Sequence, residues 1–322
     1  MQKLLKYVVA FTIITTVGII YDKYKSKYLP DEELAQIDMV NKHLLGENGY
    51  NSKRPILWIH TDNEMNARKW ITFGSRNTTK NDMPFLELCL NSIIKHCGES
   101  FNICLIDDTS YEKLIPDWKI KVNELASPLK ENIRLLSNSK LLYYYGGIVL
   151  PDSTVVLQNL LETYNNGIKE NGFFVGNVKQ NKNVLQNKTC YPNKYLLGCV
   201  KNNKEVKNYI NFLEVMISKD YTSENEFNME IEKFLSNKIK FRKVNALCSE
   251  IFGSSNSNGK IITIENLMSD KVIEYSSNTK CIVIPKKELM KRRQYGWFLK
   301  LSQREIIESN FALATLIATS QN

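Results

Sequence analysis

The sequence predicts an α/β protein of the Rossmann type, in which helices flank a mixed sheet. Short apolar runs bounded by turn residues are typical of buried strands. Segments whose apolar residues recur at intervals of three and four alternate with these runs, as expected for helices that cover a sheet. Acidic residues follow two of the predicted strands, where open α/β sheets bind ligands. With 322 residues and 43% hydrophobic content, the chain can bury a large core.

The first strand–helix–strand unit is predicted in the first half of the chain. Residues 56–60 form an apolar run between turn residues, which indicates a strand. Residues 85–94 have helical spacing, and residues 101–106 form the next apolar run. Asp107 and Asp108 follow that run directly. This order is typical of a nucleotide-binding half-domain with carboxylates at a strand end.

The most informative stretch joins a helix, a glycine turn, a short strand and one carboxylate. Apolar residues recur at helical spacing over residues 133–142, and Gly146 and Gly147 provide the backbone freedom that a helix end needs. The three apolar residues that follow predict a buried strand. Pro151 cannot donate to a sheet, so it should end this strand and leave Asp152 at its C-terminal edge.

Later segments continue the alternation of strands and helices, but the sequence does not show whether these strands run parallel or antiparallel to the earlier ones. Residues 172–176 predict another core strand, and residues 206–217 and 229–235 predict amphipathic helices. Residues 220–227 are expected to form a loop that leads into the second of these helices. The tail, residues 295–317, begins with an aromatic cluster and should finish with a helix.

The N-terminus predicts a membrane anchor. Residues 4–21 are apolar apart from Lys6 and a few threonines, which indicates an N-terminal transmembrane helix, residues 1–21. A cleaved signal peptide is the alternative, but charged rather than small residues follow the apolar run, which favours an uncleaved anchor. Lysines on both sides leave the orientation open. Residues 22–54 are polar and are expected to form a stem.

The net charge of +9 raises the question of a nucleic-acid partner. Lysines are spread over the whole chain, and a dense basic patch occurs only at residues 286–293. No zinc finger, RNP-type aromatic pattern or basic zipper accompanies the charge, so we expect no nucleic-acid binding. Anionic lipid or an anionic sugar nucleotide would suit the same patch.

The seven cysteines lack paired C-x-x-C spacing, so no zinc site is expected and most should be buried thiols. If the domain is lumenal, a disulfide such as Cys190 with Cys199 remains an open alternative.

Residues 141–154 resemble the motif of the DXD-containing glycosyltransferases of the capsular-polysaccharide-synthesis type, which runs Leu-Leu-Tyr-x-Tyr-Gly-Gly-Ile-x-Leu-Asp. Upstream segments resemble the first strand, first helix and second strand of that family (residues 55–60, 89–94 and 103–108). The resemblance covers residues 55–160. Residues 191–199 and 282–293 resemble a looser variant of the family from large DNA viruses.

The resemblance implies a GT-A-like fold that holds a nucleotide sugar over residues 55–250, with residues 251–322 as a C-terminal extension packed on it. Such enzymes move a sugar from a nucleotide-sugar donor to a glycan or protein acceptor. Mn²⁺ or Mg²⁺, which prefers hard oxygen ligands, bridges a carboxylate and the diphosphate. On this mapping Asp152 is a catalytic residue and the metal ligand, and Asp107 or Asp108 contacts the nucleotide.

The chain departs from the motif at two places. Pro151 stands where the family has its leading acid, and Leu135 and Asn138 replace an expected acid and arginine, although Arg134 lies close by. The alternative is therefore a catalytically inactive glycosyltransferase-like protein with a structural role, for example in a virion membrane. An active enzyme would be a single-pass membrane protein of the host secretory pathway (ER or Golgi) or the virion membrane.

Four further residues are candidate contacts to the donor. Arg134 is a candidate for the phosphates, with a surface ion pair as the ordinary alternative. Arg76 belongs to a basic aromatic loop, residues 66–76, that could clamp a base and a diphosphate. Gly146 and Gly147 complete this set of expected donor contacts.

Glu226 is the candidate general base for an acceptor hydroxyl. Its spacing from Ser223 is also that of a capping box, which is the simpler explanation. His60 is expected to be a packed strand residue. Residues 77–79 and 187–189 are N-glycosylation acceptor sequences, so glycans there would place the domain in the lumen.

Overall fold

The computed structural model describes residues 40–44, 50–61, 83–178, 192–219 and 224–321. The chain divides into two compact units, Met1–His43 and Leu44–Asn322. Only residues 40–43 of the first unit are described, so the predicted anchor at residues 4–21 lies outside the described residues. None of the helices in the described ranges has both the length and the apolar character that a membrane crossing requires.

The second unit alternates helices and strands along its length. In chain order its elements are β1 Ile56–His60, α3 Phe85–Cys97, β2 Asn102–Ile106, α4 Tyr111–Leu114, η3 Val122–Glu124, α5 Leu129–Tyr145, β3 Gly147–Pro151, β4 Thr154–Val156, α6 Leu161–Ile168, β5 Phe173–Asn177, β6 Pro192–Cys199, α7 Lys204–Ser218, α8 Glu224–Lys240, β7 Asn245–Leu247, α9 Ile264–Leu267, β8 Cys281–Val283, α10 Lys286–Lys291, η5 Arg293–Tyr295, η6 Phe298–Lys300, α11 Gln303–Ile307 and α12 Ala312–Gln321.

The main sheet has six strands in the order β2-β1-β3-β6-β5-β7. Strand β1 pairs in parallel with β2 on one side and with β3 on the other. Strand β6 is antiparallel to both β3 and β5, and β7 returns to a parallel pairing with β5. The predicted α/β fold with a mixed sheet is therefore confirmed.

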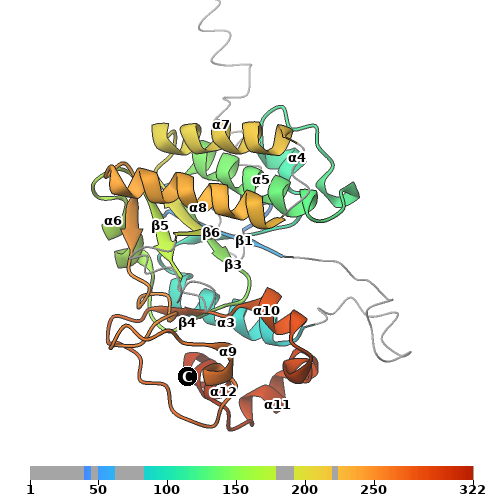
Figure 1. The fold of residues 1–322 in the computed structure, drawn as a ribbon, viewed down its shortest axis with the longest axis vertical. Coiled ribbons are helices and arrows are strands. Elements are labelled where there is room, and N and C mark those ends of the chain that lie inside the picture. The colour runs from blue at the N-terminus through green and yellow to red at the C-terminus, as the bar shows by residue number, and fades with distance from the viewer. Residues whose placement is uncertain (1–39, 45–49, 62–82, 179–191, 220–223, 322) are drawn as a thin grey trace, which may run out of the picture. The chain divides into compact units, whose positions relative to one another are not determined.

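Helices cover both faces of this sheet (Figure 1). Helices α5, α7 and α8 lie together on one face, where α5 contacts α7 and both α5 and α8 contact β6. Helix α3 lies on the other face, between the sheet and the C-terminal helices α11 and α12. The small antiparallel sheet β4–β8 packs beside α3.

Two apolar clusters use opposite sides of α3. Ile93 and Cys97 face the main sheet and contact a cluster that includes Leu57 and Phe174. The other side of α3 packs against residues from the C-terminal part of the chain, and all members of this second cluster are buried: Phe85, Leu86, Leu88, Cys89, Val155, Ile264, Leu267, Ile282, Ile284, Leu289, Phe298, Ile306, Leu313 and Ile317. The C-terminal part of the chain thereby completes the core.

The glycine pair at the start of β3 has a structural explanation. Gly146 and Gly147 have φ angles of +74° and +98°, which side chains rarely tolerate. A Cβ on Gly147 would lie 2.1 Å from the carbonyl oxygen of Ile56 on the neighbouring strand β1. The indole of Trp58 donates a hydrogen bond of 2.9 Å to the carbonyl oxygen of Gly146. The pair therefore ends α5 and lets β3 approach β1 closely.

Most of the elements predicted from the sequence are present, with small differences in their ends. The predicted loop at residues 220–227 is wrong for residues 224–227, which form the first turn of α8. The sequence pattern does not predict strand β6, because the first half of this strand is polar and only half-buried and shows no apolar run. Pro151 is the last residue of β3, as predicted.

Candidate functional site

The C-terminal ends of three parallel strands bring polar side chains to one edge of the sheet. His60 ends β1 and lies beside Ile106 at the end of β2 and Pro151 at the end of β3. Asp108 therefore follows the strand on one side of His60, and Asp152 follows the strand on the other side. This is the edge at which open α/β sheets place their ligands.

Asp108 accepts charged hydrogen bonds from several elements. The Arg134 guanidinium on α5 donates from Nε to Oδ1 at 2.7 Å and from Nη2 to Oδ2 at 2.6 Å. His60 Nε2 lies 3.0 Å from Oδ1, and Lys130 Nζ lies 3.5 Å from Oδ2. Lys130 and Arg134 are one helical turn apart, so both point from α5 toward the same carboxylate.

These partners keep Asp108 ionised. Burial alone would favour the protonated acid, since only 11% of the side chain is exposed. The hydrogen bonds from His60 and Arg134, together with the guanidinium charge, outweigh burial and hold the pKa of Asp108 well below its usual range. The His60 ring also stacks on Tyr111, with ring centroids 5.7 Å apart. The carboxylate is thus a fixed anchor for α5.

The network continues from α5 to α10 and β6. Arg134 Nη1 lies 3.2 Å from Glu131 Oε1, and Lys287 Nζ donates to Glu131 Oε2 at 2.8 Å. Lys287 Nζ also lies 3.4 Å from the Tyr195 hydroxyl. Half of the Lys287 side chain remains exposed, so this ammonium group is accessible from solvent.

Asp152 is paired with an ammonium group. Lys286 Nζ donates to Asp152 Oδ2 at 2.5 Å, and both side chains are largely buried. The backbone fixes this contact, because Ile284 N donates to the carbonyl oxygen of Ser153 at 2.9 Å and the Ser153 hydroxyl donates to the carbonyl oxygen of Ile284. Lys286 follows two residues later, at the start of α10.

The donor set around Asp152 does not fit a divalent metal ion. Within the described ranges, no group of three or more His, Cys, Asp or Glu side chains is placed to hold one. Hard cations need several oxygen ligands, whereas Asp152 is contacted by a cation of the protein itself. Lys286 is thus the cation that contacts Asp152 among the described residues.

The other predicted site residues have different surroundings. Asp107 closes its own turn, where its Oδ1 accepts hydrogen bonds from Thr109 and Ser110. Burial alone would raise the pKa of Asp107, but these hydrogen bonds outweigh burial and lower the pKa overall. Gly146 and Gly147 lie at the opposite end of β3 from Asp152.

One predicted residue lies away from the strand ends, and one lies outside the described residues. Glu226 is exposed in the first turn of α8, and Arg76 lies outside the described residues. Of the predicted set, the edge of the sheet thus brings together Asp108, Arg134 and Asp152.

Sequence reasoning missed five residues of this network: His60 as a site residue, Lys130, Glu131, Lys286 and Lys287. The spacing of Lys130 and Arg134 is a usable signal, since residues four apart share a helix face. The Lys286–Lys287 pair is visible in the sequence only as part of a basic patch, and nothing local links it to Asp152.

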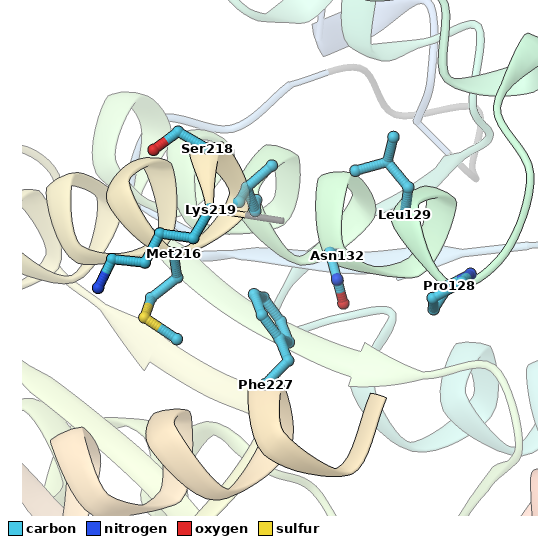
Figure 2. A pocket seen from close by; sticks show the side chains of 8 residues that line it. Pro128, Leu129, Asn132, Met216, Ser218, Lys219 and Phe227 are labelled. Atoms are coloured by element: carbon cyan, nitrogen blue, oxygen red, sulfur yellow. The ribbon is translucent and has the colours of Figure 1, made fainter. Parts of the chain in front are cut away.

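A cavity of about 300 Å³ lies close to this network, at the start of α5. It lies between α5, the end of α7 and the start of α8 (Figure 2). The described residues that line it are Pro128, Leu129, Asn132, Met216, Ile217, Ser218, Lys219 and Phe227.

Comparison with protein-family models, curated proteins and solved structures finds no match to this chain.

Proposed function

We propose that this protein is a glycosyltransferase that takes a sugar from a nucleotide-sugar donor and stabilises the leaving diphosphate with lysine side chains. The observation that carries the proposal is the Lys286–Asp152 pair at the C-terminal end of β3. The motif there resembles a metal-binding motif of sugar transferases, and the structure has an ammonium group at that carboxylate. In this proposal, Lys286 is the cation that would face the charge developing on the leaving group.

Three further features of the edge favour an anionic ligand. Lys287 is half exposed beside Lys286, and Lys130 and Arg134 lie on the first two turns of α5. Because these turns approach Asp108, the N-terminal end of the 17-residue helix α5 points to the same edge. The free N–H groups and the dipole of a helix N-terminus attract phosphate.

The proposed step is the transfer of a glycosyl group. The bond between the anomeric carbon and the diphosphate oxygen breaks, and the acceptor oxygen bonds to that carbon while its proton passes to a base. Lys286 and Lys287 would balance the charge of the released diphosphate, as a metal ion does in related chemistry. Glu226, exposed in the first turn of α8, remains the proposed base for the acceptor hydroxyl.

A non-catalytic structural role is the second candidate. It is favoured by the observation that each of the three carboxylates of the network, Asp108, Glu131 and Asp152, is already bound by a basic side chain. A network of this kind could hold the elements together without binding a substrate.

Replacement of Lys286 by methionine tests the proposal. We expect the affinity for UDP- or GDP-sugars to fall at least about tenfold, because a charge-assisted contact to phosphate is lost. Lys286→Arg should keep most of the affinity. Calorimetric titration measures both, in EDTA and then with added Mn²⁺, and donor binding should be the same in the two conditions.

Lys291→Met is the matched control, because Lys291 is exposed on the same helix and carries the same charge. It should bind the donor like the wild type. If the wild-type chain binds no donor under either condition, the structural role holds and the catalytic proposal fails.

The membrane anchor at residues 4–21 and a location in the secretory pathway or the virion membrane belong to the same proposal. They are supported by the apolar run itself and by the acceptor sequences at residues 77–79 and 187–189. A mass shift on endoglycosidase treatment, lost when Asn77 and Asn187 are replaced by Gln, would place the domain in the lumen.

A further inference from the structure

The cavity at the start of α5 has mostly apolar walls. Pro128 and Leu129 form one side, Met216 and Ile217 form another, and the Phe227 ring closes it from α8. Among the described residues that line it, Lys219 carries the one charge, and its side chain is exposed. Such walls favour an uncharged group, because an anion would lose its hydration there without enough polar partners.

One polar group inside this cavity has no partner in the described part of the chain. Asn132 is 7% exposed, and its side-chain amide makes no hydrogen bond to any described residue. Figure 2 shows the Asn132 and Phe227 side chains reaching toward the same space from α5 and α8. The amide is open to the cavity and is therefore available to pair with a ligand bound there.

We infer that this cavity binds a ring compound that carries an amide or imide group. A side-chain amide offers an N–H donor and a C=O acceptor side by side, and it pairs best with a group that offers the complementary pair. The imide of a pyrimidine base and the acetamido group of an amino sugar both do so. The Phe227 ring and the apolar walls would contact the face of the same ring.

The choice of these two candidate groups rests on the proposed function, because a pyrimidine base and an acetamido sugar both occur in substrates of glycosyltransferases. The position of the cavity suits a substrate group. Asn132 follows Glu131 on α5, and Phe227 lies under Lys194 Nζ at 5.6 Å. Lys194 and Lys287 lie over the Tyr195 ring at 4.9 Å and 5.3 Å. The cavity and the basic network therefore lie next to each other along α5.

Binding to the full-length chain tests the inference, with four probe compounds in two matched pairs. Uridine is compared with 3-methyluridine, in which the imide N–H is blocked, and N-acetylglucosamine with glucose, which lacks the amide. Saturation-transfer NMR should detect at least one amide-bearing probe and a weaker signal from its blocked or amide-free partner. The pair that responds identifies the source.

The decisive variant is Asn132→Leu, which keeps the volume and removes the amide. We expect at least about tenfold weaker binding of the responding probe, because its amide partner is lost. The melting temperature should stay close to that of the wild type, because no hydrogen bond between described residues is removed. Asn132→Asp, which loses the N–H donor, should also weaken binding. Asn211→Leu, an exposed asparagine on α7, is the matched control and should bind normally.

Two results would overturn the inference: none of the amide-bearing probes binds, or Asn132→Leu binds them as the wild type does. Failure of the proposed function gives a different pattern. If the protein neither binds nor transfers a nucleotide sugar, the probes would still bind in an Asn132-dependent way.

Discussion

At the residue scale, Asp108 connects more elements than any other carboxylate of the described network. It follows β2, contacts His60 at the end of β1, and receives Lys130 and Arg134 from α5. The two hydrogen bonds from Arg134 match the fork of the guanidinium to the two carboxylate oxygens. Loss of the charge would leave a buried guanidinium without its main partner.

Asp108→Asn should lower the free energy of unfolding by about 3 kcal/mol at pH 7, because one member of a buried ion pair is removed. The folded-state pKa of Asp108 is depressed, so its contribution is present above the unfolded-state pKa, about 4, and is lost as the pH falls through the folded value. The difference between wild type and variant should therefore shrink below about pH 4. Urea unfolding at several pH values measures it.

Asp270→Asn is the matched control for this prediction, since Asp270 is exposed and makes no ion pair with the described residues. It should change stability little at any pH. A loss in Asp108→Asn that stays constant down to about pH 2 would contradict the assignment of the charge to this network.

The sequence placed Asp108 and Asp152 at strand ends, where the structure has them, but it did not predict Glu131 or the lysine partners. Asp108 and Asp152 each follow an apolar run, and a strand end can be located from such a run. Lys286 lies 134 residues after Asp152, and Lys287 lies 156 residues after Glu131. Such ion pairs depend on how β8 and α10 pack against the rest of the fold. The spacing of residues within a short segment of sequence does not predict that packing.

At the element scale, the turn from α5 into β3 sets the position of the edge. The glycine pair is readable in the sequence as a helix end, but the second reason for it, contact with the β1 backbone, is visible only in the folded sheet. Strand β6 is likewise missed in the sequence, because its first half is polar. Its pairing with β3 and β5 forms the antiparallel part of the sheet.

Gly147→Ala should destabilise the protein by at least about 3 kcal/mol, because the φ of +98° strains any side chain and the new Cβ would overlap the Ile56 carbonyl. Thermal or urea unfolding measures the loss. Gly296→Ala is the control: Gly296 has an ordinary helical conformation, and its nearest neighbour to a new Cβ is at 3.5 Å. That variant should be neutral or gain about 0.5 kcal/mol.

At the scale of the whole molecule, the C-terminal part of the chain covers α3 and supplies the cations of the site. Strand β8 pairs with β4, and α12 packs against both α3 and β4. Leu313 on α12 is fully buried in this second cluster. The alternating pattern near β1 and β2 predicts the α/β class, while this distant packing has no local signature.

Leu313→Ala should cost about 3 kcal/mol of unfolding free energy, because it leaves a cavity in a filled core. Ile307→Ala, at a side chain that is 43% exposed, should cost no more than about 1 kcal/mol. Equal losses for the two variants would show that α12 is not part of the cooperative core.

The two lysines at the start of α10 also set an order for maturation. During synthesis the ribosome delivers strands β1 to β3 long before Lys286 and Lys287, so Asp152 and Glu131 emerge without the ammonium groups that later neutralise them. Any part of this sheet edge that folds before α10 emerges would hold Asp152 and Glu131 without these two lysine partners.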